Sequence, residues 1–171
     1  GLWSGGLFGL RGPNGGGKRP TARMLVTLLF PTSGTASILG QDTVREADVV
    51  RRLIGYVPQE RAIDRFLTGR EHLELLGALY HLSKAEAAKR IAELLKLVEL
   101  EEAADRAANT YSGGMKRKLD ISCGILPDPK ILFLDEPTLG LDVLSRLRFW
   151  DYMLRLKERG FNIVLTKDIL E

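Results

Sequence analysis

The stretch GPNGGGKRP, which runs from Gly12 to Pro20, decides how the rest of this sequence is interpreted. It follows the spacing G-x-x-x-x-G-K, with Gly12, Gly17 and Lys18 in register. Glycines at this spacing let successive backbone N–H groups turn toward an anion, and the lysine can reach the β- and γ-phosphates of a nucleotide. The stretch therefore predicts a phosphate-binding loop, provided that a strand precedes it and a helix follows.

Both flanking conditions are met by the pattern of apolar residues. The run GLFGL at 6–10 is short, apolar and bounded by glycine, as expected of a strand. The run ARMLVTLLF at 22–30 has a helical apolar face before Pro31 and Gly34 end it. A plain glycine-rich surface turn is the weaker interpretation, because Lys18 lies in the slot that phosphate chemistry requires.

Composition excludes several classes of protein. The chain has 171 residues, of which 44% are hydrophobic, so it is long enough for one globular domain with a real core. No apolar run approaches the roughly 18 residues of a membrane span, and no secretory leader opens the chain, so we expect a soluble, cytosolic chain. The single Cys123 excludes a disulfide framework and a zinc cluster. A net charge of +3, with a basic cluster only at Met115–Lys118, gives little support to nucleic-acid binding.

The remaining strands and helices follow an α/β order. A short strand is expected at 35–39 and another from Ile54. The apolar run at 130–137, between prolines, is typical of a strand buried on both faces of a parallel sheet. A helix at about 144–158 and a strand at 161–166 complete a βαβ unit.

Between these parts the chain is helical. An amphipathic run follows a capping-box candidate formed by Ser83 and Glu86. We therefore predict an α/β core in two pieces, 1–60 and 127–171, interrupted by a helical subdomain at 61–126.

Two carboxylates follow the buried strand. Asp135 and Glu136 stand at its carboxyl end, which is where α/β proteins place catalytic groups. Asp135 is suited to serve Mg²⁺, directly or through its second coordination shell, and Glu136 to polarise an attacking water as general base. A strand that simply ends in two solvated acids is common, but it is the weaker interpretation beside a phosphate loop.

A second candidate anion site occurs in YSGGMKRKLDIS, where Ser112 and two glycines open a helix. An ordinary helix N-cap would explain the same residues. Two anion sites cannot fold onto one phosphate without great distortion, which suggests that a partner supplies the second site.

These motifs together resemble the ATP-binding subunit of an ABC transporter, over practically the whole chain. GPNGGGK is similar to the Walker A motif, and YVPQE, with Gln59, is similar to the Q-loop. YSGGM is similar to the signature and ILFLDEP to Walker B. LGLD, which ends at Asp142, is similar to the D-loop. The stretches SGGMKRKLDIS and DEPTLGLD are similar to those of members that drive drug, polysaccharide or lipid export through a separate permease, such as the daunorubicin-resistance type.

The resemblance implies a P-loop NTPase core, an inserted helical subdomain, and a head-to-tail dimer that binds ATP with Mg²⁺. Ser112 and Gly114 would contact the γ-phosphate in trans, Gln59 would sense Mg²⁺ and the permease, and Asp142 would cross the interface. The residues expected to line the ATP site are Gly12, Asn14, Gly15, Gly17, Lys18, Arg19, Pro20, Ser112, Gly113, Gly114 and Asp142.

The same resemblance implies the partners and the location. The expected partners are a second ATP-binding subunit, identical or different, and a transmembrane permease. No nucleic acid and no direct membrane insertion are expected, so the chain would lie peripherally at the cytoplasmic face.

Arg11 stands where the family usually has an aliphatic residue at the end of the strand, and it adds a desolvation cost unless its head group reaches water. The sequence also departs from the family pattern at three further positions. Arg19 replaces the hydroxyl residue that ligates Mg²⁺, Pro20 lacks the N–H that the loop turns toward the phosphates, and Asp168 stands at the switch position in place of histidine. We also expect truncation at both ends. A degenerate partner subunit, a decayed gene and an incomplete, error-bearing sequence are the competing explanations, and we favour the third because each of the three further changes needs one base.

The preferred hypothesis is an ATPase subunit that powers export, with Mg-ATP hydrolysis by this copy impaired. The alternative is a non-hydrolysing partner that contributes Ser112 and Gly114 to another subunit's site. Soluble family members of translation or DNA repair are a weaker third possibility.

Overall fold

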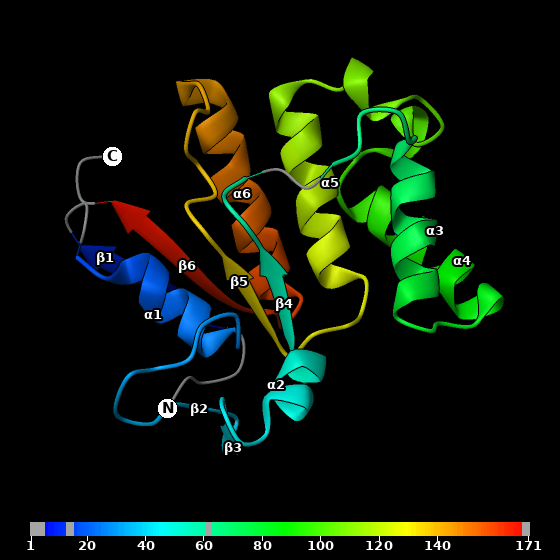
Figure 1. Ribbon diagram of the computed structural model, residues 1–171. Coiled ribbons are helices and arrows are strands. Elements are labelled where there is room, and N and C mark those ends of the chain that lie inside the picture. The colour runs from blue at the N-terminus through cyan, green and yellow to red at the C-terminus, as the bar shows by residue number, and fades with distance from the viewer. Residues whose placement is uncertain (1–5, 13–15, 61–62, 169–171) are drawn as a thin grey trace. The chain divides into compact units, whose positions relative to one another are not determined.

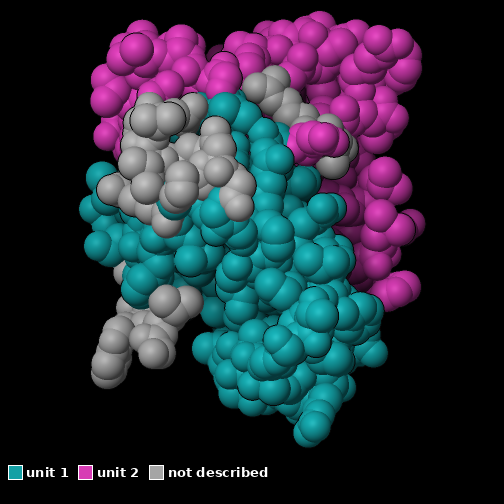
Figure 2. Space-filling view, turned by 60° about the vertical axis from the view of Figure 1, so that its left-hand side comes forward, with its two compact units in different colours: residues 1–59, 129–139, 154–171 teal, residues 60–128, 140–153 magenta. Residues whose placement is uncertain are grey.

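The computed structural model describes residues 6–12, 16–60 and 63–168, with the backbone alone at 11, 167 and 168 (Figure 1). The chain divides into two compact units, coloured separately in Figure 2. The first unit comprises 1–59, 129–139 and 154–171, and the second 60–128 and 140–153. The predicted division at 60 and 126 stays a prediction; by compactness, the segment 140–153 groups with the helical residues.

A four-stranded parallel sheet forms the first unit, in the order β1-β6-β5-β4. Its strands are β1 (Leu7–Gly12), β4 (Ile54–Val57), β5 (Ile131–Leu134) and β6 (Asn162–Asp168). All four residues of β5 are buried, which confirms the prediction of a central strand covered on both faces. The α/β fold class is therefore confirmed.

Two helices and a hairpin accompany this sheet: α1 (Lys18–Leu25), α2 (Ala47–Leu53), and β2 (Ser37–Ile38) paired with β3 (Gln41–Asp42). The first helix lies against β1 and β6 (Figure 1). A cluster of buried apolar side chains forms a core of this unit: Val26, Ile38, Val50, Ile54, Ile131, Phe133 and Val164.

The prediction of a helix at 22–30 was wrong at both ends. The helix begins at Lys18 because Gly17, with φ 76°, turns the chain into it. It ends at Leu25 because Thr27 adopts a left-handed φ of 63°, and Phe30 is then left 76% exposed. The predicted strand at 35–39 is also shorter, because Gly40, with φ 85°, turns the hairpin.

Helices make up the second unit: α3 (Gly69–Leu79), α4 (Lys84–Leu97), α5 (Gly113–Ile125) and most of α6 (Val143–Glu158), with 3₁₀ turns η1 (Glu101–Ala103) and η2 (Ala108–Thr110). The α3 helix packs against α4 and α5. The largest fully buried side chains of the second unit are aliphatic or Met: Leu73, Leu95, Leu100, Leu119, Ile121, Leu126 and Met153.

Local hydrogen bonds explain where these helices begin. The Ser83 hydroxyl accepts from the Glu86 N–H at 3.2 Å and starts α4, which is one half of the predicted capping box. The Glu86 carboxylate accepts a 2.6 Å hydrogen bond from Arg90. A reciprocal capping box that the sequence analysis missed starts α3, where the Thr68 hydroxyl accepts from the Glu71 N–H and the Glu71 carboxylate accepts from the Thr68 N–H. None of the helices in the described residues has the length and apolarity needed to cross a bilayer.

Candidate functional site

The parallel sheet brings the predicted site residues of the first unit to one edge. The strand β1 ends at Gly12, β4 ends two residues before Gln59, and β5 ends directly before Asp135. Because all strands run in the same direction, these positions lie at the carboxyl edge, where α/β proteins bind ligands. Asp168 ends β6 at the same edge, paired in register with Gly12.

The start of α1 is built for an anion. Lys18 is the first helical residue, and its Nζ donates a 2.5 Å hydrogen bond back to the Gly12 carbonyl. The N–H groups of the first helical turn have no carbonyl partner within the helix, so this end is electropositive. Among the described residues, apart from its chain neighbours, no atom lies within 4 Å of the position that a Cβ of Gly17 would take. A phosphate group fits this end; Asn14 and Gly15, also predicted to bind it, lie outside the described residues.

Pro20 is accommodated in the first turn of α1. It is the third residue of α1, where an N–H has no intrahelical partner to lose. The helix is already hydrogen-bonded at the next residue, since the Thr21 N–H donates to the Gly17 carbonyl at 3.0 Å. The substitution therefore leaves the helix intact and removes one backbone donor from the anion site.

Asp135 is held rigidly beneath the sheet edge. Its carboxylate is 6% exposed and accepts a 2.6 Å hydrogen bond from the Thr166 hydroxyl and a 3.5 Å hydrogen bond from the Tyr56 hydroxyl. Burial raises the pKa of Tyr56, and the negative charge of Asp135 raises that pKa further, so Tyr56 stays a hydrogen-bond donor.

Thr166 also positions Glu136. Its hydroxyl donates to Asp135 and accepts from the Glu136 N–H at 2.9 Å, so one buried side chain orients both acids. Glu136 itself has a φ of 42°, a left-handed conformation that costs a non-glycine residue about 1–3 kcal/mol and is found most often at functional sites. The sequence analysis missed Thr166; the signal was a hydroxyl at the end of a buried strand.

Arg19 pairs with Glu136. The Arg19 Nη2 lies 3.6 Å from the Glu136 Oε2, and the side chains are 50% and 13% exposed. Sequence reasoning identified Arg19 only as a missing metal ligand and did not predict this contact. The position that should supply a hydroxyl instead supplies a cation facing the predicted general base.

The donor set does not fit a directly bound Mg²⁺. Magnesium takes oxygen ligands in octahedral geometry, and a guanidinium has no lone pair to offer. Both carboxylate oxygens of Asp135 already accept hydrogen bonds, and Glu136 faces Arg19. Among the residues that the structure describes, no group of three or more His, Cys, Asp or Glu side chains is arranged to hold a metal.

The other predicted site residues belong to the second unit, where two of them cap helices. The Ser112 hydroxyl accepts from the Met115 N–H at 3.2 Å at the start of α5. The Asp142 carboxylate accepts from the N–H and the hydroxyl of Ser145, at 2.9 and 2.6 Å, at the start of α6. These hydrogen bonds lower the pKa of Asp142. Ser112, Gly113 and Asp142 are exposed, so their capping role leaves them accessible.

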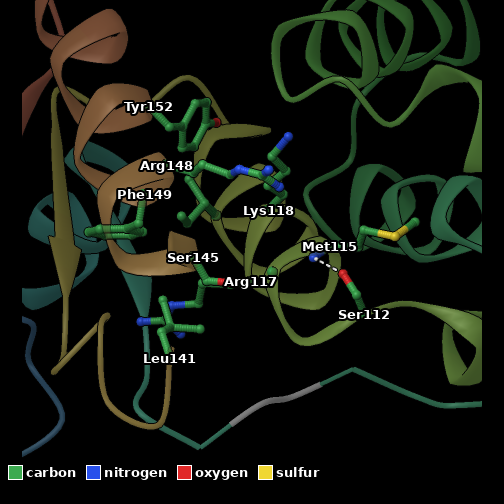
Figure 3. Close-up of a pocket in the computed structure, with 11 residues that line it drawn as sticks. Ser112, Met115, Arg117, Lys118, Leu141, Ser145, Arg148, Phe149 and Tyr152 are labelled. Carbon is green, nitrogen blue, oxygen red and sulfur yellow. Dashed lines mark hydrogen bonds between the residues drawn. The ribbon is translucent and has the colours of Figure 1, made fainter. Parts of the chain in front are cut away.

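A cavity of ≈ 150 Å³ opens beside Ser112 and Gly114 (Figure 3). Its basic wall consists of Arg117 and Lys118 from α5 and Arg148 from α6. Arg117 lies 3.8 Å from Asp120, and Lys118 lies 3.1 Å from Glu99. The start of α5 thus carries an exposed hydroxyl next to a hollow that three basic side chains help to line, two of them paired with acids.

Comparison with known proteins agrees with this geometry. A family model described as ABC transporter matches residues 1–139. The chain is 47% identical over 165 residues to the daunorubicin/doxorubicin resistance ATP-binding protein DrrA of Streptomyces peucetius, covering 96% of this chain and 50% of that protein. It is 46% identical over 165 residues to the doxorubicin resistance ATP-binding protein DrrA of Mycobacterium tuberculosis, again with 96% and 50% covered.

A solved structure agrees as well. The structure described as the ATP binding subunit of an ABC transporter superposes with a TM-score of 0.78 at 35% identity, covering 98% of this chain and 70% of that chain. The chain spans about half the length of the curated relatives named above. Because the family model matches residues 1–139, the chain belongs to the ABC transporter family.

Proposed function

We propose that this chain is the ATP-binding part of an exporter and powers substrate passage through a separate membrane permease. One observation carries the proposal: Lys18 at the start of α1 shares a sheet edge with two acids, Asp135 and Glu136, that a single buried hydroxyl orients. This arrangement suits phosphate binding next to a general base.

Within this proposal each residue of the first unit has a role. The loop residues Gly12, Asn14, Gly15 and Gly17 face the phosphates with backbone N–H groups, and Lys18 binds the β- and γ-phosphates. Glu136 would orient the attacking water, and Asp135 would act at the metal's second shell. Gln59 would sense Mg²⁺ and the permease. Asp168, at the switch position, would repel the γ-phosphate as a carboxylate, because an ionised acid has no hydrogen to donate. Mg²⁺ would be the cofactor of a family member that has a hydroxyl at the position of Arg19.

The second unit contributes to the site of a partner subunit. Ser112, Gly113 and Gly114 would contact the γ-phosphate across a head-to-tail dimer, and Asp142 would cross that interface. The exposure of Ser112 and Asp142, and the basic hollow beside Ser112, support this part of the proposal.

The exported compounds are proposed from the relatives. One relative is described as a daunorubicin/doxorubicin resistance protein and another as a doxorubicin resistance protein, so a drug cargo is the proposal that the similarity favours. The permease would contact that cargo, and this chain would lie at the cytoplasmic face of the membrane through the permease.

Hydrolysis by this copy is proposed to be impaired. A glutamate that faces a guanidinium at 3.6 Å is a weaker base toward water, and the missing hydroxyl removes a metal ligand. The same ion pair favours a second candidate function, in which the chain binds nucleotide without hydrolysing it and completes the site of a competent partner.

The first test compares ATP binding by the chain and by its Lys18→Ala variant, measured by calorimetric titration. The proposal expects the variant to lose at least about tenfold in affinity, because a charged phosphate contact is removed. Lys116→Ala, a lysine on α5 in the other unit, is the matched control and should bind as the parent does. Equal affinity of Lys18→Ala and its parent would contradict the proposal.

A mixing experiment separates the two candidate functions. If the chain acts as a non-hydrolysing partner, adding it to a competent family subunit produces hydrolysis at one site per mixed dimer. Ser112→Ala in this chain should then reduce that hydrolysis. Hydrolysis by the chain alone would exclude the partner function.

A further inference from the structure

Arg19 places a positive charge at the position where a bound triphosphate would need a metal ion. It is the second residue of α1, next to Lys18, and its guanidinium lies 3.6 Å from the Glu136 carboxylate. Half of the Arg19 side chain remains exposed. A guanidinium carries five N–H donors in a planar fork, so one edge can face Glu136 while another receives phosphate oxygens.

The same residues disfavour a divalent cation beside the phosphates. Arg19 and Lys18 place two positive charges in the first turn of α1, where the helix N-terminus adds to them. The Asp135 carboxylate already accepts hydrogen bonds from Thr166 at 2.6 Å and Tyr56 at 3.5 Å, which leaves it fewer lone pairs for a metal. A metal ion would therefore meet like charges and few oxygen ligands.

We propose that Arg19 replaces the divalent cation, so that this chain binds ATP as the metal-free nucleotide. The guanidinium bridges the terminal phosphates and Glu136, which ties the glutamate to a cation and keeps it from activating water. This inference rests on the proposed function, in that the loop at Gly12–Lys18 must bind ATP.

The test is calorimetric titration of ATP into the 171-residue chain, once with excess Mg²⁺ and once with EDTA. The chain should bind several-fold more tightly in EDTA than with excess Mg²⁺, because Mg²⁺ converts the metal-free nucleotide into its magnesium complex. Equal affinity in both buffers would overturn the preference for metal-free ATP. Arg19→Thr should lose at least about tenfold in EDTA, since a charge-assisted contact is removed, and should recover with Mg²⁺ because a hydroxyl ligand is restored. Arg23→Thr removes an exposed arginine from the same helix and should bind as the parent does in both buffers.

A double variant tests the bridge itself. Glu136→Gln removes the competing carboxylate, so metal-free ATP should bind several-fold more tightly. The gain should vanish in the Arg19→Thr background, because it requires the guanidinium. A gain of equal size in both backgrounds would mean that Glu136 repels ATP directly, and it would overturn the bridge.

The remaining outcomes also decide the matter. Binding by the chain that requires Mg²⁺, or binding by Arg19→Thr alone, overturns the role of Arg19 and leaves the proposed function standing. Failure of all variants to bind ATP, with cooperative thermal unfolding intact, overturns the proposed function and this inference together. If Arg19→Thr does not fold, Arg19→Lys, which keeps the charge but not the fork, should bind metal-free ATP several-fold more weakly; unchanged binding would contradict the fork.

Discussion

At the scale of single residues, the candidate site depends on the hydroxyl of Thr166. It is 2% exposed, donates to Asp135 and accepts from the Glu136 N–H. Such a residue carries no charge and forms no motif of its own, so its role emerges only when β5 and β6 are paired.

Thr166→Val should destabilise the fold by about 1–3 kcal/mol, because a buried carboxylate loses its shortest hydrogen bond while the side-chain shape is kept. Urea denaturation measures the change. Thr166→Ser keeps the hydroxyl and is the control, with a smaller loss expected. Equal stability of Thr166→Val and the parent would show that the hydroxyl is not what holds Asp135.

The single cysteine is predicted to be unreactive in the folded chain. Burial, followed by the charge of Asp120, raises the pKa of Cys123 to about 12. At pH 8 the thiolate is therefore scarce, and a thiol reagent should label the folded chain far more slowly than the urea-unfolded chain.

The same shift predicts a dependence of stability on pH. The thiol ionises near pH 9 when unfolded, so its contribution to stability is fully present below that pH and is lost as the pH rises toward 12. Comparison with Cys123→Ala isolates this term. Cys123 is half-buried, so the slow labelling is expected from its raised pKa, and rapid labelling of the native chain at pH 8 would contradict that shift.

At the scale of elements, the strands were easier to predict than the helix ends. The buried strand β5 was predicted correctly because its apolar run is continuous and bounded by prolines. The first helix was misjudged because the apolar residues Leu28, Leu29 and Phe30 suggested a continuing buried face, whereas they are exposed after a left-handed turn at Thr27. Periodicity alone does not reveal where a backbone turns.

Contacts between distant residues could not be predicted at all. The Arg19–Glu136 pair joins the first turn of α1 to the end of β5, and its formation depends on how the sheet brings these ends together. The sequence did supply the chemistry of each partner. It also supplied the candidate loop and acids, because their spacing is dictated by local geometry.

The start of α3 offers a sharp test of packing. A Cβ on Gly69 would lie 2.3 Å from the Tyr111 hydroxyl oxygen, which donates a 2.6 Å hydrogen bond to the Ala103 carbonyl. Intrinsic helix propensity alone would make alanine better than glycine by about 1 kcal/mol. The clash reverses that sign, so Gly69→Ala should destabilise the chain by about 1–3 kcal/mol.

Removing the hydroxyl should relieve this penalty. In a Tyr111→Phe background the nearest remaining atom is the ring carbon at 3.2 Å, so the added cost of Gly69→Ala should shrink markedly. Thermal unfolding of the four variants gives the coupling. Additive effects would contradict the close approach of Gly69 and Tyr111.

At the scale of the whole molecule, two compact units carry the residues of the family's site. The first holds the phosphate loop and the two acids, and the second holds Ser112 and Asp142 at helix starts. The match over residues 1–139 and the solved ATP-binding subunit support one common architecture. Position 19, where the resemblance implies a hydroxyl, carries the Arg19 guanidinium, which lies 3.6 Å from the Glu136 carboxylate.

The most direct test of that account is Mg²⁺-dependent ATP hydrolysis by the chain and by a version carrying Arg19→Thr, Pro20→Thr and Asp168→His. We predict that the chain hydrolyses no faster than its own Glu136→Gln variant, whereas the restored chain exceeds its Glu136→Gln control by about 100-fold, the usual contribution of a general base. Hydrolysis by the unaltered chain above its control would contradict the account, as would failure of the restored chain to exceed its control.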